Sequence, residues 1–181
     1  MSGYCLEQSL KLHEDEKKLR EIRVTDAESL CAYIQGYWEF IFNHKMFGSI
    51  WDIYADEIEV KRENGFTLRG IDAVEANIMN LCAAFTDLKI DVATIFAAPE
   101  GEDAYRVWMR YYFTGTNTAV SIYGPPSGLK LERDKALNIS SYLVRKIDDE
   151  WLIVDEYTGR CCDYIRAVCT GDGSFTTLKL S

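Results

Sequence analysis

Apolar side chains follow a helical spacing in the first half of the chain and a strand-like alternation in the second half. Apolar residues spaced three or four positions apart predict helices over residues 5–23, from Thr25 onward, over "GSIWDIYADE" and over "GIDAVEANIMNLCAAF". The second helix is expected to open with a capping box, "TDAE", at Thr25 to Glu28. Between the third and fourth helices, "EIEVKRENGFTLRG" alternates around Asn64-Gly65, which predicts a hairpin.

Beyond residue 87 the period becomes two, and four strands are expected at about 88–97, 103–116, 132–147 and 151–159. Helices followed by an antiparallel meander are typical of an α+β fold. We expect an N-terminal helical extension (1–25), one domain (26–160) and a tail (161–181) that forms a helical turn and then a short strand.

The predicted sheet has two chemically different faces. We assign to an apolar face Tyr105, Val107, Met109, Tyr111, Phe113, Leu137, Ile139, Ser141 and Leu143. We assign to a mixed face Arg106, Trp108, Arg110, Tyr112, Thr114, Asn138, Ser140, Tyr142, Val144, Trp151, Ile153, Asp155 and Tyr157. The alternation of side chains along a strand is the basis of both assignments.

Two arrangements of these faces are open. The apolar face packs on the helices and the mixed face meets water, or the mixed face lines a concave pocket and the apolar face is buried against a second subunit. The first leaves Trp108, Tyr112, Tyr142, Trp151 and Tyr157 in water together, a larger aromatic patch than monomers usually expose. We therefore favour the second, with a small hydrophobic or aromatic ligand in the pocket and a homodimer through the apolar sheet face.

Composition narrows the partners. The 181 residues are 48% apolar and carry a formal charge of −9, with Lys and Arg scattered, which argues against binding to nucleic acid or to an anionic membrane. No apolar run is long enough to span a bilayer, and the N-terminus has no apolar core of a secretory signal. With six cysteines in no scaffold spacing, we expect a cytoplasmic protein with reduced thiols. Two histidines, His13 and His44, predict no metal site.

An ordered set of segments carries a family resemblance. "WDIYADEIEV", "AAFTDLKIDVATIFA", "YFTGTNTAVSIYGPPSGLKL" and "VRKIDDEWLIVDEY" resemble the SnoaL-like branch of the nuclear transport factor 2-like superfamily, which includes polyketide cyclases and ketosteroid isomerases. The resemblance implies a cone-shaped α+β fold, with a strongly curved antiparallel sheet wrapped around N-terminal helices (a cystatin-like α+β barrel), usually as a homodimer. The chain departs from the catalytic patterns at three places: Tyr142 and Asn117 replace an acid/base Asp and a His, and Lys61-Arg62 replaces a general-base Asp.

Asp155 is the predicted general base, because an aromatic pocket would raise its pKa toward neutrality. Tyr142 and Tyr157 are predicted to donate hydrogen bonds to a developing enolate, and Asn138 to orient the carbonyl. The alternative is that Asp155 pairs with Arg110 on a neighbouring strand. The remaining predicted ligand-binding residues are Arg110, Trp108, Tyr112, Ser140, Trp38 and His44.

These residues predict a small-molecule pocket and proton abstraction next to a carbonyl. The leading hypothesis is a lyase, cyclase or isomerase that needs no cofactor and acts on a hydrophobic carbonyl compound. The alternatives are a non-catalytic small-molecule-binding protein with the same pocket, and a dimerisation module whose pocket is filled by its own aromatic side chains. An open cavity of a few hundred Å³ would separate the first two from the third.

Overall fold

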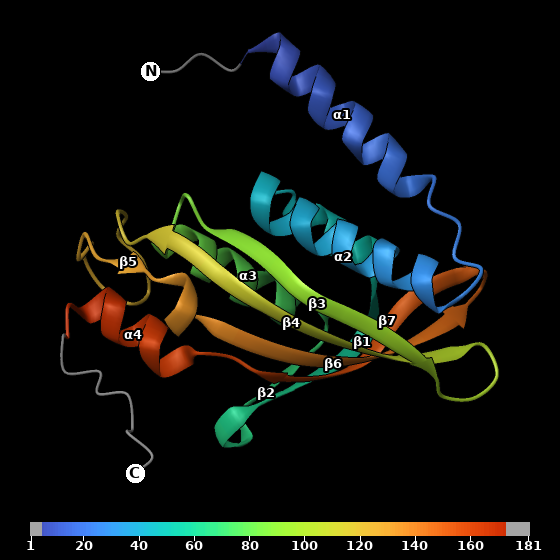
Figure 1. The fold of residues 1–181 in the computed structure, drawn as a ribbon. Helices are drawn as coiled ribbons and strands as arrows, with labels where there is room; N and C mark the ends of the chain where they lie inside the picture. Colours follow the sequence, from blue (N-terminus) through green and yellow to red (C-terminus); the bar gives the residue numbers. More distant parts are fainter. Residues whose placement is uncertain (1–4, 173–181) are drawn as a thin grey trace.

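The computed structural model describes residues 5–172 (Figure 1). The helices are α1 (Leu6–Arg20), α2 (Ala27–His44), α3 (Ile71–Ala84) and α4 (Cys162–Thr170), with short 3-10 helices at Phe47–Asp52, Glu63–Gly65 and Arg133–Lys135. The strands are β1 (Tyr54–Arg62), β2 (Thr67–Arg69), β3 (Lys89–Pro99), β4 (Ala104–Thr116), β5 (Lys130–Leu131), β6 (Leu137–Ile147) and β7 (Glu150–Gly159). None of the helices in this part of the chain is long and apolar enough to cross a membrane.

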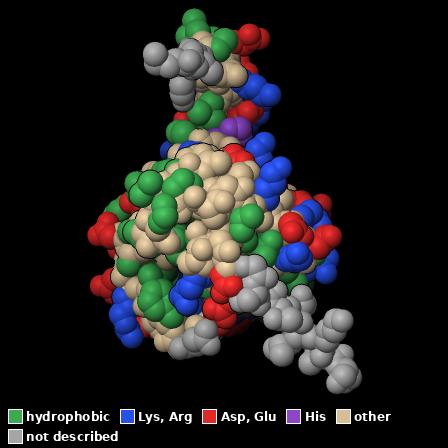
Figure 2. Space-filling view, turned by 90° about the vertical axis from the view of Figure 1, so that its left-hand side faces the viewer, with side chains coloured by type: hydrophobic (Ala, Val, Ile, Leu, Met, Phe, Trp, Pro, Cys, Tyr) green, Lys and Arg blue, Asp and Glu red, His purple; other side chains and the backbone are tan. Residues whose placement is uncertain are grey.

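The strands form one curled sheet in the order β2-β1-β7-β6-β4-β3, with β5 paired to β4. Helix α2 lies along its concave side, and α1 projects away from the rounded body (Figures 1 and 2). The α+β class and the curved sheet around helices are confirmed. The sheet is antiparallel, as expected, except that β1 pairs with β7 in parallel.

Element boundaries follow local chemistry. Helix α2 starts one residue later than predicted, because the capping box is made by Asp26 and Ser29: the Asp26 carboxylate accepts a hydrogen bond from the Ser29 N–H at 2.8 Å. The segment expected to form a third helix gives a short 3-10 helix and then the start of β1. In the tail, α4 is a helix of nine residues rather than one turn, and the strand predicted after it lies outside the described residues.

The register of β4 and β6 overturns the predicted assignment of faces. Tyr111 pairs with Asn138 and Val107 with Tyr142, so the polar positions of β6 share a face with the apolar positions of β4. This inner face is buried under the helices, whereas Ile139 lies on the outer face with 53% of its surface exposed. The predicted mixed and apolar faces are therefore each split between the two sides of the sheet.

A bulge in β7 adds a second shift. Leu143 pairs with Asp155, but Val144 pairs with Ile153, so Val154 has no partner on β6. Such an extra residue reverses the alternation of side chains along the rest of the strand. Ile153 is fully buried on the inner face, and after the bulge the inward position is taken by Glu156 rather than Asp155.

The concave interior is filled by aromatic side chains. The Trp38 indole stacks on Phe42 at 5.2 Å between ring centroids and lies 5.9 Å from Tyr142 and 6.3 Å from Tyr54. The apolar residues of β4 (Val107, Met109, Tyr111 and Phe113) are at most 1% exposed within the single chain. The prediction that a second subunit buries these residues is wrong, because the chain's own interior does so.

Candidate functional site

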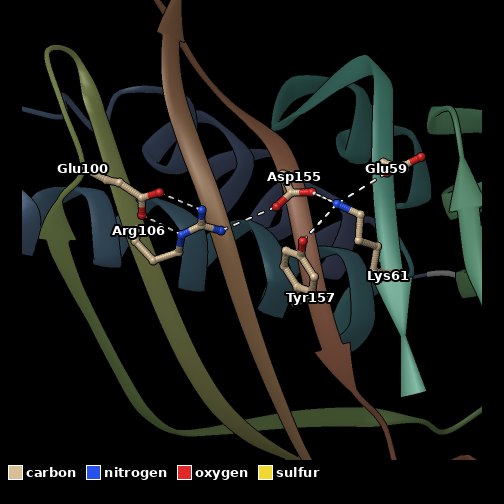
Figure 3. A network of polar contacts seen from close by, with 6 residues as sticks. All are labelled: Glu59, Lys61, Glu100, Arg106, Asp155 and Tyr157. Carbon is tan, nitrogen blue, oxygen red and sulfur yellow. Dashed lines mark hydrogen bonds and ion pairs between the residues drawn. The ribbon is translucent and has the colours of Figure 1, made fainter. Parts of the chain in front are cut away.

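The predicted base, Asp155, lies in an ion-pair network on the outer face of the sheet (Figure 3). Its two carboxylate oxygens lie 3.0 Å from Lys61 Nζ and 3.6 Å from Arg106. Lys61 also donates to the Tyr157 hydroxyl at 3.1 Å, and Arg106 binds Glu100 at 2.7 Å. The alternative prediction was that Asp155 pairs with Arg110. Asp155 does form ion pairs, but its partners are Lys61 and Arg106. The Asp155 carboxylate is thus engaged by two cations on the outer face and does not face the aromatic interior.

Most of the other predicted ligand-binding residues on the outer face contact side chains of the chain itself. Arg110 donates to the Thr94 hydroxyl at 3.1 Å. The Trp108 ring stacks on Phe96 at 5.1 Å, and Arg133 lies 4.1 Å above the ring of Tyr112. His44, at the end of α2, is exposed beside Phe40 and lies away from the interior. The single pocket expected for all ten predicted residues is therefore wrong: the sheet separates Trp38, Asn138, Ser140 and Tyr142 inside from Trp108, Arg110, Tyr112, Asp155 and Tyr157 outside.

A buried carboxylate, Glu156, is the centre of a polar network on the inner face. Its Oε2 accepts a hydrogen bond from the Tyr54 hydroxyl at 2.6 Å, and its Oε1 accepts one from the Thr158 hydroxyl. The Ser140 hydroxyl lies 2.7 Å from that of Thr158 and extends the chain of hydrogen bonds. Burial, followed by the nearby charge of Glu156, raises the pKa of Tyr54 and of Tyr142 well above the ordinary value. Both tyrosines therefore keep their protons at neutral pH.

Asn138, predicted to orient a substrate, instead supports the chain around β6 and α4. Its Nδ2 donates to the Ala136 carbonyl at 2.8 Å, and its Oδ1 accepts from the Cys161 N–H at 3.2 Å. Asn138 is fully buried, so its hydrogen-bonding groups are used within the fold.

Open space lies where β1 and β7 end beside α3 and α4. A cavity of about 320 Å³ is present there, which we call the mouth pocket. Its size is at the lower end of the range for small-molecule sites. It is lined by Arg62, Glu63, Phe66, Asn77, Leu81, Tyr123, Arg160, Cys162, Asp163, Ile165 and Arg166.

Two arginines and one asparagine form the polar wall of the mouth pocket. Arg62 donates to the Asn77 Oδ1 atom at 2.9 Å, and Arg160 donates to the same oxygen at 3.2 Å. Burial and the charge of Arg160 lower the pKa of Arg62. Burial also lowers the pKa of Arg160, but Tyr111 and Glu156 oppose this and raise it overall, so both side chains are charged at neutral pH.

The thiols at this site are poor nucleophiles. Burial, then the Glu63 side chain, raises the pKa of Cys162 to about 11, and burial raises that of Cys161 to about 12. A thiol must lose its proton to attack a substrate or bind a metal. No group of three or more His, Cys, Asp or Glu side chains within residues 5–172 is arranged to hold a metal ion.

Sequence reasoning did not select Arg62, Asn77, Glu156 or Arg160 as site residues. A signal was present at the end of β7, where Glu156 and Thr158 share one face of the strand and Arg160, the residue after the strand, continues the same alternation. Their direction depended on the bulge at Val154, which periodicity cannot reveal. Arg62 belongs to the Lys61-Arg62 pair that stands where ketosteroid isomerases have a general-base Asp, and the structure places it at the mouth pocket.

Similar folds occur among solved structures. A nuclear transport factor 2-like superfamily protein of Salmonella enterica serovar Typhimurium matches with a TM-score of 0.56 and 14% identity, over 72% of this chain and 87% of that one. The chain has the nuclear transport factor 2-like fold. A candidate SnoaL-like polyketide cyclase of Jannaschia matches this fold with a TM-score of 0.51 and 15% identity, over 72% and 86% of the two chains. A candidate scytalone dehydratase of Novosphingobium aromaticivorans gives 0.55 and 12%, over 86% and 88%.

No protein-family model and no curated protein sequence matches the chain. The resemblance of the sequence segments to this superfamily is confirmed at the level of fold. Because one fold hosts many functions, the chemistry must be argued from the side chains of the site.

Proposed function

We propose that this protein binds a small molecule in the mouth pocket. The observation that carries the proposal is the cavity of about 320 Å³, which lies at the open end of the sheet while the deeper interior is filled by Trp38 and its aromatic neighbours. Pockets that combine an apolar wall with a few polar groups are the usual small-molecule sites. Phe66, Leu81 and Ile165 form the apolar part of the lining, which also includes the arginine pair.

A neutral fluorescent probe, N-phenyl-1-naphthylamine, tests this proposal. We expect saturable binding to the purified protein, and about tenfold weaker binding to Phe66→Ala, because the variant loses a ring from the pocket wall. The matched control is Phe96→Ala: both rings are 55% exposed, but Phe96 lies on the outer face. An absence of saturable binding, or an equal loss in both variants, would contradict a ligand in the mouth pocket.

A second candidate function is acid/base catalysis on a hydrophobic carbonyl compound, as a lyase, cyclase or isomerase. It is favoured by Glu156, a carboxylate 1% exposed that lies four residues before Arg160 of the mouth pocket on the inner face of β7. Glu156 would take the role of proton acceptor that the sequence suggested for Asp155, with the protonated Tyr142 beside it. Its support also includes similar folds in proteins described as a cyclase and a dehydratase.

Glu156→Gln separates the two functions. For an enzyme, turnover of a reactive carbonyl substrate falls by a factor of about 10² or more, because the proton acceptor is lost. For a binding protein, the probe affinity of the variant is unchanged and no turnover is seen in either protein. Asp155→Asn is the control, since it removes the neighbouring carboxylate from the opposite face of the sheet.

We also propose a homodimer, formed through the outer face of the sheet instead of the buried apolar residues of β4. This face exposes Phe96, Leu137, Ile139 and Tyr157 by 40–55%. The same face carries acidic and basic side chains in alternation, including Asp155, Arg106 and Lys61 (Figure 3). A two-fold axis brings such a surface against its own copy. Acidic side chains of one subunit can then meet basic side chains of the other, and apolar side chains can meet apolar ones.

A further inference from the structure

The two arginines of the mouth pocket share a single neutral acceptor. Arg62 Nη2 and Arg160 Nη1 both donate to Oδ1 of Asn77, at 2.9 and 3.2 Å. Each guanidinium has five N–H donors, so this amide oxygen, together with the Tyr111 side chain that also interacts with Arg160, satisfies a small part of the pair. The Nε atoms of both arginines are buried and have no hydrogen-bond acceptor within the part of the chain that the structure describes.

The carboxylates near this pair are engaged elsewhere. Glu63 Oε2 accepts the main-chain N–H of Arg160 at 3.0 Å, and Glu156 is held by Tyr54 and Thr158. Across residues 5–172, no carboxylate oxygen lies within ion-pair distance of either guanidinium. By contrast, Arg20, Arg69, Arg106 and Arg133 each bind a carboxylate.

Burial makes this arrangement unusual. Arg160 is 8% exposed and its guanidinium lies 5.7 Å from the Phe113 ring, so water gives it little compensation. A buried charge is normally paired, because its loss of hydration is costly. Here two like charges lie together in a chain whose formal charge is −9. A third arginine, Arg166, lines the same pocket together with the acidic side chains of Glu63 and Asp163.

We propose that the mouth pocket is selective for an amphipathic organic anion, with a carboxylate or sulfonate group bound between Arg62 and Arg160 and an apolar body against Phe66, Leu81 and Ile165. This inference rests on the proposed small-molecule site and names its ligand class. Planar guanidinium groups match the spacing of two oxygens in such an anion and can bind them in pairs. The oxygens of the ligand would supply the acceptors that the chain itself does not provide.

A matched pair of probes tests the charge preference. 8-Anilinonaphthalene-1-sulfonate is N-phenyl-1-naphthylamine with one added sulfonate, so the difference between their affinities reports on the anion site. We expect the sulfonate probe to bind at least tenfold more tightly than the neutral probe, and the difference to shrink as salt is added. Equal affinities at low salt would overturn the inference and leave the proposed binding function standing. Failure of both probes to bind would overturn both.

Asn77→Asp is the decisive variant. It keeps the size of the side chain but places a carboxylate between the two guanidinium groups, where it competes with a ligand anion. We expect the sulfonate probe to bind at least tenfold more weakly, the neutral probe to change by less than twofold, and the melting temperature to rise. The matched control, Asn80→Asp, adds the same charge one turn along α3, at a residue that is not among those lining the pocket.

A second variant keeps the test independent of any effect on α3. Arg62→Gln removes one half-buried guanidinium and retains a polar side chain that can reach Asn77. We expect it to remove most of the preference for the sulfonate probe, whereas Arg110→Gln on the outer face leaves the preference unchanged. Retention of the full preference in both Asn77→Asp and Arg62→Gln would overturn the inference.

Discussion

Asp155 and Glu156 are neighbouring carboxylates with opposite environments. Asp155 lies on the outer face between Lys61 and Arg106, and Glu156 is 1% exposed among hydroxyl groups on the inner face. The free energy of each charge is set by what surrounds it: two cations at the surface, and the hydrogen bonds of Tyr54 and Thr158 inside. Chemical identity alone therefore does not decide which of the two carboxylates can contribute to a site.

Replacing each of these carboxylates by alanine should have unequal effects on stability. Glu156→Ala leaves the buried Tyr54 hydroxyl without its acceptor, so we expect the free energy of unfolding to fall by about 2–3 kcal/mol. Asp155→Ala should cost less than about 1 kcal/mol, because Arg106 retains Glu100 and Lys61 retains Glu59. Urea unfolding measures both, and equal losses would contradict the assignment of the two faces.

At the scale of single elements, helix α2 supplies the interior and depends on its N-terminal cap. The Asp26 carboxylate accepts hydrogen bonds from the N–H and hydroxyl of Ser29 at 2.8 and 2.7 Å. These bonds, the backbone bond first, lower the pKa of Asp26 below its ordinary value of 3.8. The same helix carries Trp38, so the cap fixes the start of the element that fills the cone.

The cap should make a part of the stability depend on pH. A lowered pKa in the folded state means that the contribution of Asp26 is complete above pH 3.8 and is lost as the pH falls through the lower, folded value. We expect the difference in unfolding free energy between the natural protein and Asp26→Ala to be constant near neutral pH and to shrink in acid. Asp26→Ser, a cap that does not titrate, is the control. A difference that persists unchanged below the folded pKa would argue against an ionised cap.

The positions of most helices and strands could be predicted from the sequence, but the assignment of side chains to the two faces of the sheet could not. Helical spacing and alternation located α1, α2, α3, β4 and β7 to within a few residues, because they reflect burial along one continuous segment. The relation between strands depends on register, which pairs Val107 with Tyr142, and on the unpaired Val154. Both the register and the bulge are set by pairing between segments that are distant in the sequence, and a shift of one residue exchanges the two faces of a strand. The arginines and the asparagine of the mouth pocket come from β1, α3 and the residue after β7, so no local pattern unites them.

At the scale of the whole molecule, the cone is closed inside and open at one end. Aromatic side chains of α2 and the inner face fill the centre, and the mouth pocket is a cavity beside this aromatic core. This agrees in part with the dimerisation-module hypothesis, since the interior is filled by the protein's own rings. The separate cavity at the mouth is the feature that still supports a ligand.

The outer face should control the oligomeric state. Ile139→Glu places a charge on a side chain that is 53% exposed in the monomer, and burial of that charge in a dimer interface should weaken association by a factor on the order of 100. Val120→Glu, at a position 76% exposed outside the named strands, is the control. Light scattering after size-exclusion chromatography measures the mass. A monomeric natural protein, or a dimer that tolerates Ile139→Glu, would contradict the proposed interface.

The bulge at Val154 also bears on how relatives of this protein would have to be compared. A relative that lacks the extra residue could carry the same Asp-Glu pair and yet turn the first carboxylate inward and the second outward. Insertion or deletion of one residue is therefore a route by which evolution could exchange an interior acid for a surface acid without any substitution. Equivalent residues in β7 would be found by superposition of Cα positions, since an alignment of letters would match acids that face opposite ways.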